Sequence, residues 1–387
     1  MDRLSTVSVI CEYNPFHFGH KYQIDKLKET FRGVVCIISG DIVQRGSVAA
    51  ADKYLRAEAA LKSGADLVLE HPVPFCCSSA RDFASSGVHI ASAIGTDSLA
   101  FGAEDGEEML FNIYSLVKRA DFDEKVKALV EKSKNISYPQ ALVQLVAESL
   151  GEPAAEAVKK PNNILALEYL KALEHTNLSP FFVKREPGFR SSSQIRAEVD
   201  AEAMLSLLPP ESRSVFTRES GIRFPRDQKR LDSFFIGTLR RAGYESADAS
   251  ELYSCPQDLR KKILQSAVKC SSVDELVAAC TDKGYTGARV RRAINAIVFG
   301  ITPKAVCKKP PYTTVLAAND IGREILRTAK RRAEIDIVNK PVRALSLGEE
   351  TKNAFLFAKS IEDVIAISDP TPSPADIGRN PLIGEPL

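Results

Sequence analysis

Residues 10–23, ICEYNPFHFGHKYQ, constrain the fold of this chain more than any other stretch. Apolar residues at 6–11 predict a buried strand, an Asn-Pro pair and a glycine predict the turn that ends it, and residues 20–31 carry apolar side chains at helical spacing. We therefore expect His17 and His20 where a first strand gives way to a first helix. Ligands bind at this edge of an open α/β sheet, and the N-terminus of a helix there attracts phosphate.

The tetrad His17-Phe18-Gly19-His20 places two imidazoles three residues apart. Both can reach one phosphate from such a turn, and glycine lets the backbone approach a nucleotide closely. When a nucleophile attacks an α-phosphate, these donors stabilise the charge that develops on the equatorial oxygens and on departing pyrophosphate. An incidental or core-packed pair is the first alternative. A metal site is the second, and it lacks a third ligand nearby.

Strand and helix patterns alternate over the first half of the chain. Apolar strands separated by helices predict a parallel sheet covered on both faces, and right-handed crossovers make a Rossmann-like α/β topology the default. The expected strands are 7–11, 34–39, 67–70, 98–101 and 178–184, with helices from residue 20 and at 50–63 and 79–93.

Helical patterns dominate the rest of the chain. Residues 107–174 read as a helical insertion in a first domain that spans residues 1–212. Residues 213–387 read as a mainly helical C-terminal domain that contains a short strand–helix–strand element at 312–338. The proline-rich tail from about residue 369 is expected to be extended or disordered.

Composition limits the kinds of partner. The formal net charge is only +2, so nucleic acid would have to bind a local basic patch. No stretch resembles a signal peptide or a membrane span, and we expect a cytoplasmic protein that has no membrane partner. The eight cysteines form no CxxC pair and are expected to be reduced and mostly buried.

The motif SSSQIR at 191–196 is the second candidate for phosphate binding. Hydroxyls, backbone N–H groups at a helix start and an arginine could all contact pyrophosphate. An ordinary capped helix is the alternative. The candidate phosphate contacts are Ser191, Ser192, Ser193 and Arg196.

With these motifs in place, the chain resembles known families. The tetrad followed by SSSQIR is similar to the HIGH superfamily of nucleotidylyl transferases. The string EYNPFHFGHKYQ, with SGDIVQRGSVAAADKYLRAEAALKSGADLVLEHP at 39–72 and KPNNILALEYL at 160–170, resembles the tRNA(Met) cytidine acetate ligase family. Further matching blocks are SSARDFASSGV at 78–88, FGAE at 101–104, YTGARVRRAI at 285–294 and VLAANDIGREIL at 315–326. Two departures, His71 within EHP and the third serine of SSSQIR, remove no group that the chemistry needs.

The resemblance implies a two-step reaction. Acetate would attack the α-phosphate of ATP, which arrives with Mg²⁺, to give acetyl-adenylate, and the wobble cytidine of elongator tRNA(Met) would then take the acetyl group to become N4-acetylcytidine. His17 and His20 would be catalytic. The implied ATP site consists of Ile10, Cys11, Glu12, Tyr13, Asn14, Pro15, Phe16, His17, Phe18, Gly19, His20, Lys21, Tyr22, Gln23, Gly102, Asn162 and Arg185.

Three of these residues have plain structural alternatives. Gly102 follows a strand where a side chain would block the nucleotide, but it could be a simple strand-end turn. Asn162 starts a helix and could be its cap. Arg185 offers a fork for phosphate, or it could be an ordinary surface arginine.

Basic residues in three segments are candidates for RNA contact. The QRG motif at 44–46 and the helix after it should lie on the sheet edge that holds the site, and the clusters RVRR at 289–292 and RTAKRR at 327–332 are expected on helices. Solvated helix faces are the alternative for each. The candidates are Arg45, Lys53, Arg56, Arg289, Arg291, Arg292, Lys330 and Arg331.

Two rival functions remain open from the sequence. A small-molecule adenylyltransferase would use the same HxGH chemistry and would not need the basic C-terminal helices. A non-catalytic RNA-binding protein could retain a nucleotide pocket and bind ATP without turnover. The other histidines, His71, His89 and His175, are expected to be structural.

Overall fold

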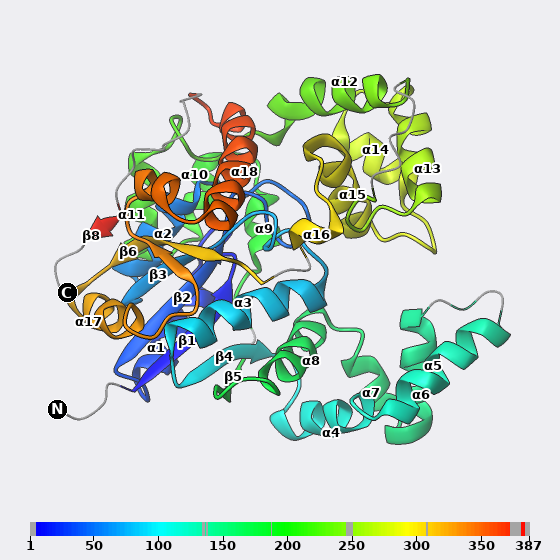
Figure 1. Ribbon diagram of the computed structural model, residues 1–387, viewed down its shortest axis with the longest axis horizontal. Coiled ribbons are helices and arrows are strands. Elements are labelled where there is room, and N and C mark those ends of the chain that lie inside the picture. The colour runs from blue at the N-terminus through cyan, green and yellow to red at the C-terminus, as the bar shows by residue number, and fades with distance from the viewer. Residues whose placement is uncertain are drawn as a thin grey trace.

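The computed structural model describes residues 5–133, 136, 138–186, 188–244, 251–306, 309–371 and 381–383. Within these ranges the chain forms an α/β fold on one eight-stranded sheet (Figure 1). The strand order is β5-β4-β1-β2-β3-β6-β7, and β8 pairs with β6. The strands are β1 (Thr6–Cys11), β2 (Gly33–Ser39), β3 (Leu67–His71), β4 (Ser98–Ala103), β5 (Ser179–Lys184), β6 (Tyr312–Ala318), β7 (Asp336–Val338) and β8 (Leu382–Ile383).

The first five strands run parallel, as the alternating pattern predicts. β1 pairs with β2 and β4, β2 pairs with β3, and β4 pairs with β5, all in the parallel sense. The carboxyl ends of β1, β4 and β5 therefore meet at one edge of the sheet. The prediction of a parallel, Rossmann-like α/β fold is confirmed.

Successive residues of the strands face two different cores. In β2, Val35 and Ile37 pack in one apolar cluster, whereas Val34, Cys36 and Ile38 pack in the other. This alternation follows from the two-residue period of a strand, and burial on both sides explains why the strands are apolar throughout.

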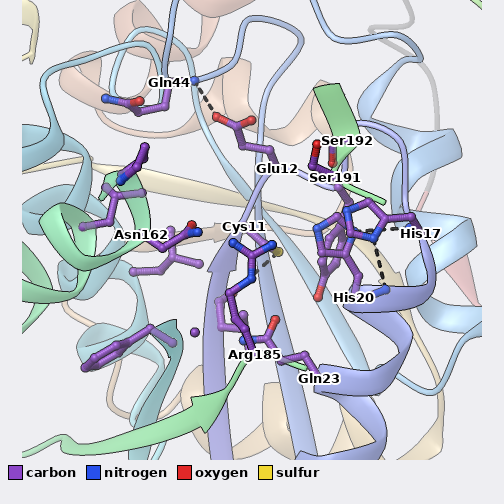
Figure 2. A pocket seen from close by; sticks show the side chains of 18 of the residues that line it. Cys11, Glu12, His17, His20, Gln23, Gln44, Asn162, Arg185, Ser191 and Ser192 are labelled. Atoms are coloured by element: carbon purple, nitrogen blue, oxygen red, sulfur yellow. Dashed lines mark hydrogen bonds between the residues drawn. The ribbon is translucent and has the colours of Figure 1, made fainter. Parts of the chain in front are cut away.

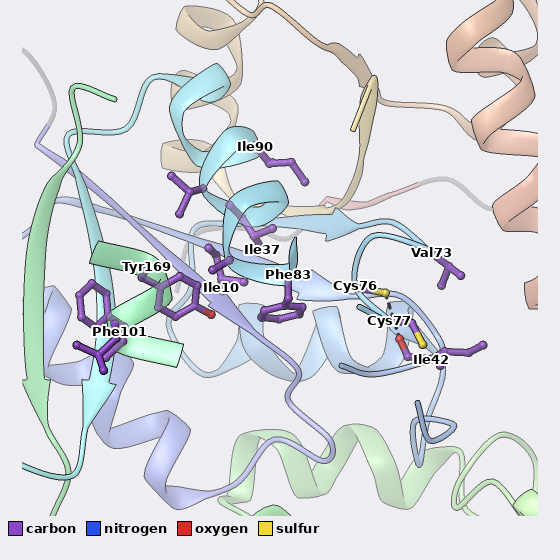
Figure 3. Packing of buried hydrophobic residues seen from close by; sticks show 14 of the residues in the cluster. Ile10, Ile37, Ile42, Val73, Cys76, Cys77, Phe83, Ile90, Phe101 and Tyr169 are labelled. Atoms are coloured by element: carbon purple, nitrogen blue, oxygen red, sulfur yellow. Dashed lines mark hydrogen bonds between the residues drawn. The ribbon is translucent and has the colours of Figure 1, made fainter. Parts of the chain in front are cut away.

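Helices cover both faces of the sheet. One core contains residues of α1, α2 and α11, and the other contains residues of α3, α8 and α17. Figure 3 shows the second core, where Ile10 and Ile37 of the sheet lie close to Phe83 and Ile90 of α3. These helices are α1 (Phe18–Lys28), α2 (Lys53–Lys62), α3 (Ala80–Ile94), α8 (Pro161–Leu173), α11 (Pro210–Arg218) and α17 (Asp320–Ala329).

Two groups of helices extend away from the sheet (Figure 1). The first, between β4 and β5, consists of α4 (Glu107–Val117), α5 (Ala120–Lys132), α6 (Tyr138–Leu150) and α7 (Glu152–Ala157). The second consists of α12 (Asp232–Ala242), α13 (Gln257–Ala267), α14 (Val273–Cys280), α15 (Gly287–Phe299) and α16 (Pro303–Val306).

Shorter elements and one long helix complete the fold. α18 has 17 residues, and no pattern in the sequence led us to expect it. These elements are α9 (Ser192–Arg196), α10 (Ala201–Ser206), α18 (Glu349–Ile365) and the 3₁₀ turns Gln228–Leu231, Pro341–Ser346 and Ala366–Ser368.

The sheet continues past the proposed domain boundary at residue 212. β6 pairs antiparallel with β3, with Leu67 opposite Ala318, so the part of the chain assigned to the C-terminal domain contributes strands to the first sheet. The division into two domains stays a prediction. Of the proline-rich tail, residues 372–380 and 384–387 lie outside the described residues, and β8 pairs with β6.

The seven cysteines in the described ranges are free thiols, most of them buried, while Cys307 lies outside those ranges. In the same part of the chain, no helix is both long enough and apolar enough to cross a membrane.

Candidate active site

A cavity of about 530 Å³ opens at the carboxyl ends of β1, β4 and β5. Figure 2 shows His17 and His20 on one side, Asn162 on the other and Arg185 between them. The cavity gathers most of the site residues expected from the sequence. Those lining it are Ile10, Cys11, Glu12, Tyr13, His17, Gly19, His20, Tyr22, Gln23, Arg45, Gly102, Asn162, Arg185, Ser191, Ser192, Ser193 and Arg196.

Five residues of the expected ATP segment do not line the cavity. Phe16 and Asn14 are buried, and the Asn14 side chain accepts a hydrogen bond from the backbone N–H of Ala50. Lys21 pairs with an aspartate one turn along α1. The Asn14 contact holds the strand-to-helix turn in place. The five residues are Asn14, Pro15, Phe16, Phe18 and Lys21.

The two histidines are oriented by the start of α1. His17 is the N-cap residue, and its Nδ1 accepts the backbone N–H of Gly19 at 3.1 Å, while Nδ1 of His20 accepts the backbone N–H of His17 at 3.3 Å. A neutral imidazole that accepts at Nδ1 carries its proton on Nε2. The two rings stack with centroids 3.7 Å apart. The pair therefore presents two N–H donors from a fixed geometry.

Gly19 packs tightly against the His17 ring. A Cβ at this position would lie 3.0 Å from Cε1 and 3.2 Å from Nδ1 of that imidazole. The sequence predicts that a glycine here allows close approach of a nucleotide. The structure adds a second reason, since a side chain there would crowd the His17 ring.

Both imidazoles are neutral at pH 7. Burial, with the charges of Arg185 and Arg196, lowers the pKa of His17 to about 4. Burial, His17 and Arg185 hold the pKa of His20 well below its usual value. Bound phosphates would oppose these effects, because a negative charge favours protonated imidazole.

Two arginines bring positive charge to the same space. The Arg185 side chain is 46% exposed, and the nearest carboxylate among the described residues is that of Glu104, 3.9 Å away. Arg196 donates to the backbone carbonyl of Asn14, which fixes it beside the histidine turn. Arg185 is therefore available to a phosphate, and Arg196 is held at the edge of the cavity.

All three serines of the motif line the cavity, and one of them also caps a helix. Ser191 caps α9, where its hydroxyl accepts the N–H of Gln194 and the Gln194 side chain accepts the N–H of Ser191. Ser191 therefore caps the helix and also lines the cavity, and its contact with phosphate stays a prediction. Ser192 and Ser193 line the cavity from the first turn of the same helix.

Asn162 is not the cap of α8. Lys160 holds that position, and Asn162 donates to the Glu104 carboxylate at 2.6 Å while facing the cavity. Its neighbour Asn163 is buried and ties α8 to the loop after β4, where its side chain accepts the N–H of Glu104. At Gly102 a Cβ would meet only ordinary contacts, so a need for glycine there would come from a ligand.

The positions of Lys53 and Arg56 contradict the prediction that these residues contact RNA. Both are buried, at 3% and 0% exposure. Arg56 donates to the carbonyls of Glu12, Ser39 and Gly40, which joins the ends of β1 and β2. A side chain enclosed in this way cannot meet an RNA backbone. Its role is to hold the strand ends that carry the cavity.

The two basic clusters lie far apart (Figure 1). On α15, Arg292 donates to the carbonyl of Gln44 at 3.3 Å, Arg291 pairs with Asp274, and Arg289 stacks on Tyr285. Lys330 and Arg331 are exposed at the end of α17, on the opposite side of the molecule. Only the α15 cluster adjoins the loop that lines the cavity, and RNA contact by either cluster stays a prediction.

Several lining residues were not singled out from the sequence. Tyr169 and Asn162 lie seven residues apart on α8, which is two helical turns, so helical spacing could have predicted that both face the cavity. Gln44 donates its backbone N–H to the Glu12 carboxylate at 3.0 Å. No pattern in the sequence predicts that contact. The other histidines, His71, His89 and His175, do not line the cavity.

A family model and curated relatives indicate the same family for this chain. A family model described as HIGH Nucleotidyl Transferase matches residues 4–370. The chain is 30% identical to the tRNA(Met) cytidine acetate ligase of Caldanaerobacter subterraneus subsp. tengcongensis, covering 90% of this chain and 92% of that protein. It is also 30% identical to the protein of the same name from Clostridium novyi, covering 89% and 92%.

A solved structure shares the fold. The crystal structure of Thermotoga maritima TmcAL bound with alpha-thio ATP superposes with a TM-score of 0.89 at 24% identity, covering 99% of this chain and 100% of that chain. The ligand named belongs to that protein. In the described part of the present chain, no group of three or more histidine, cysteine, aspartate or glutamate side chains is arranged to hold a metal ion.

Proposed function

The chain belongs to the HIGH nucleotidyl transferase family and, within it, to the tRNA(Met) cytidine acetate ligases, and from that premise we propose that it acetylates the wobble cytidine of elongator tRNA(Met). ATP with its Mg²⁺, acetate and the tRNA are the substrates, and N4-acetylcytidine is the product. Because the proposed acceptor is tRNA, we place the protein in the cytoplasm. The observation that carries the proposal is the convergence of His17, His20 and Arg185 on one cavity.

The first step activates acetate. A carboxylate oxygen of acetate attacks the α-phosphorus of ATP, the bond to the β-phosphate oxygen breaks, and acetyl-adenylate and pyrophosphate form. The Nε2–H groups of His17 and His20 and the guanidinium of Arg185 stabilise the charge on the phosphoryl oxygens. Acetate needs no base, since it is ionised near pH 7.

The second step transfers the acetyl group. The 4-amino nitrogen of cytidine attacks the acetyl carbon, the bond from that carbon to the adenylate oxygen breaks, and AMP leaves. The cavity volume of about 530 Å³ is in the range of small-molecule and cofactor sites. Arg45, at the rim, and the adjoining helix α15 supply positive charge on the side from which an RNA would approach.

The test is to incubate the protein with ATP, labelled acetate and unmodified tRNA(Met), and to look for acetyl-adenylate and N4-acetylcytidine. His20→Ala should lower the yield of both products about 100-fold or more while the protein stays folded, and the exposed His175 serves as the control for a histidine change. ATP turnover without tRNA and with another acceptor would favour the small-molecule adenylyltransferase. Binding of ATP without any turnover would favour the non-catalytic RNA-binding protein.

A further inference from the structure

Glu12 places a carboxylate inside the cavity, directly after β1. Its Oε1 accepts the backbone N–H of Gln44 at 3.0 Å, and the described residues provide no other hydrogen bond to this side chain. Figure 2 shows it between Gln44 and the histidine pair. A carboxylate with one oxygen anchored and the other open can accept a proton from a bound substrate.

The surroundings of Glu12 make it a better base than an exposed glutamate. Burial raises the pKa of its carboxyl group, and the N–H of Gln44 with the charges of Arg196, Arg45 and Arg56 opposes that effect. These charged groups come from α9, from the loop after β2 and from α2. A base is most effective when its pKa approaches the working pH.

Other groups in the cavity are poor proton acceptors. His17 and His20 already accept backbone N–H groups at Nδ1, so their Nε2 atoms carry protons. Burial raises the pKa of the Tyr169 phenol and of the Cys11 thiol, which keeps both protonated. The second lining carboxylate, Glu186, is exposed.

We infer that Glu12 is the proton acceptor of the acyl-transfer step, an inference that rests on the proposed function. As the 4-amino nitrogen of cytidine bonds to the acetyl carbon, that nitrogen gives one proton to Oε2 of Glu12. The carbon–oxygen bond to adenylate then breaks, and the electron pair leaves with AMP. The first step has no proton to remove, so Glu12 serves the second step alone.

The loop that anchors Glu12 also contacts the basic helix α15. Gln44 donates through its side chain to the carbonyl of Ser78 at 3.0 Å and accepts Arg292 of α15 at its own carbonyl. Gly46 packs against α15 so closely that a Cβ there would lie 2.9 Å from Cβ of Arg291. The carboxylate therefore lies between the histidine pair and the basic helix, where an incoming nucleotide would meet an acyl phosphate.

The experiment separates the two steps. Acetate-dependent exchange of pyrophosphate into ATP reports adenylate formation, and acetylation of tRNA(Met) from chemically prepared acetyl-adenylate reports transfer. For Glu12→Gln, the ratio of transfer to exchange should fall by about 100-fold or more, the usual contribution of a general base. Glu29→Gln is the control, since Glu29 ends α1 outside the cavity, and its ratio should stay within about twofold of wild type.

Each other outcome has a distinct meaning. If Glu12→Gln lowers both rates equally, Glu12 binds ATP or its magnesium and the inference is wrong. If the wild-type protein shows no acetate-dependent exchange, the proposed function fails and the inference falls with it. Glu12→Asp retains a carboxylate, so its ratio of transfer to exchange should be at least about tenfold higher than that of Glu12→Gln. This variant keeps the inference testable if the glutamine variant folds poorly.

Discussion

The same edge of the sheet carries two groups of charged residues, of which one lines an open cavity and the other is buried. After β1, β4 and β5 lies the open cavity, whose Arg185 side chain is 46% exposed. After β2 and β3 lies a second group, which we call the closed charge cluster. It consists of Asp41, Lys53, Arg56, Glu70, Arg226, Glu362 and Asp369, all of them buried or nearly so.

The two groups differ in whether their charges are paired inside the protein. In the closed charge cluster, Lys53 lies 2.5 Å from Glu70 and also contacts Glu362, while Arg226 bridges Asp41 at 3.0 Å and Asp369 at 2.6 Å. Its charges are satisfied within the protein, because α18 supplies Glu362. In the cavity, the described carboxylate nearest Arg185 is 3.9 Å away. Both groups contain arginines and carboxylates, and the presence of internal partners decides which group can bind a ligand.

Removing a charge from the closed charge cluster should have the largest effect. Lys53→Met removes the cation paired with the buried Glu70 and leaves Glu362 with Lys359 alone, and the free energy of unfolding should fall by about 3–5 kcal/mol. Denaturant unfolding measures this. Lys62→Met is the matched control on the same helix, since its side chain is 45% exposed, and it should change stability by less than about 1 kcal/mol. Equal losses of stability for the two lysine variants would contradict the contrast between buried, paired charges and exposed ones.

The cavity should show the opposite balance, with activity lost and the fold retained. His20→Ala should lower acetate-dependent pyrophosphate exchange about 100- to 1000-fold, as expected for one donor to developing charge. Its stability cost should be about 1 kcal/mol, because His20 also accepts a backbone N–H at the start of α1. If His20→Ala retained pyrophosphate exchange and His175→Ala lost it, the catalytic role assigned to His20 would be wrong.

Two histidines allow a finer comparison by pH. Burial lowers the pKa of His71 to about 3, and His17 is lowered to about 4 by burial and two arginines. The unfolded chain, with histidine near 6.5, then binds more protons than the folded protein, so stability falls as pH drops from 6.5 towards 4, by on the order of 2–3 kcal/mol for His17. His17→Gln should reduce that slope in denaturant titrations.

A bound nucleotide should change the pKa of His17 and leave the pKa of His71 unchanged. Phosphates beside His17 should raise its pKa, whereas His71, bonded to Ser86 and packed on Phe83, should not respond. Ring-proton NMR titrations with and without an ATP analogue test this. Movement of both histidines, or of neither, would show that the cavity is not where the phosphates bind.

The smallest expected effect concerns RNA. Arg45 and Arg289 lie on the loop and the helix next to the cavity, whereas Lys330 and Arg331 lie far away. Replacing the first pair by alanine should reduce the salt-dependence slope of tRNA binding by about 1–2, and replacing the second pair should leave it unchanged. Filter binding over a salt series decides between them. A larger change for the second pair would move the RNA surface to α17.

Much of the cavity could be predicted because local patterns define it. The HxGH turn, the strand ends and SSSQIR each carry their signal within a few residues. Lys53 and Arg56 could not be told from Arg185 in this way, because their partners come from distant elements. α18 was missed for the same reason. Its buried Lys359 and Glu362 interrupt the apolar face that would mark a helix, and they are buried only because they pair with each other and with Lys53.

The central claim is that the open cavity joins acetate to adenylate before the acetyl group reaches tRNA. Acetate labelled with ¹⁸O at both oxygens tests it directly in the complete reaction with ATP and unmodified tRNA(Met). Because an acetate oxygen attacks the α-phosphorus and stays there when the acetyl carbon departs, the AMP released should carry one ¹⁸O for each N4-acetylcytidine formed. AMP without the label would contradict the account.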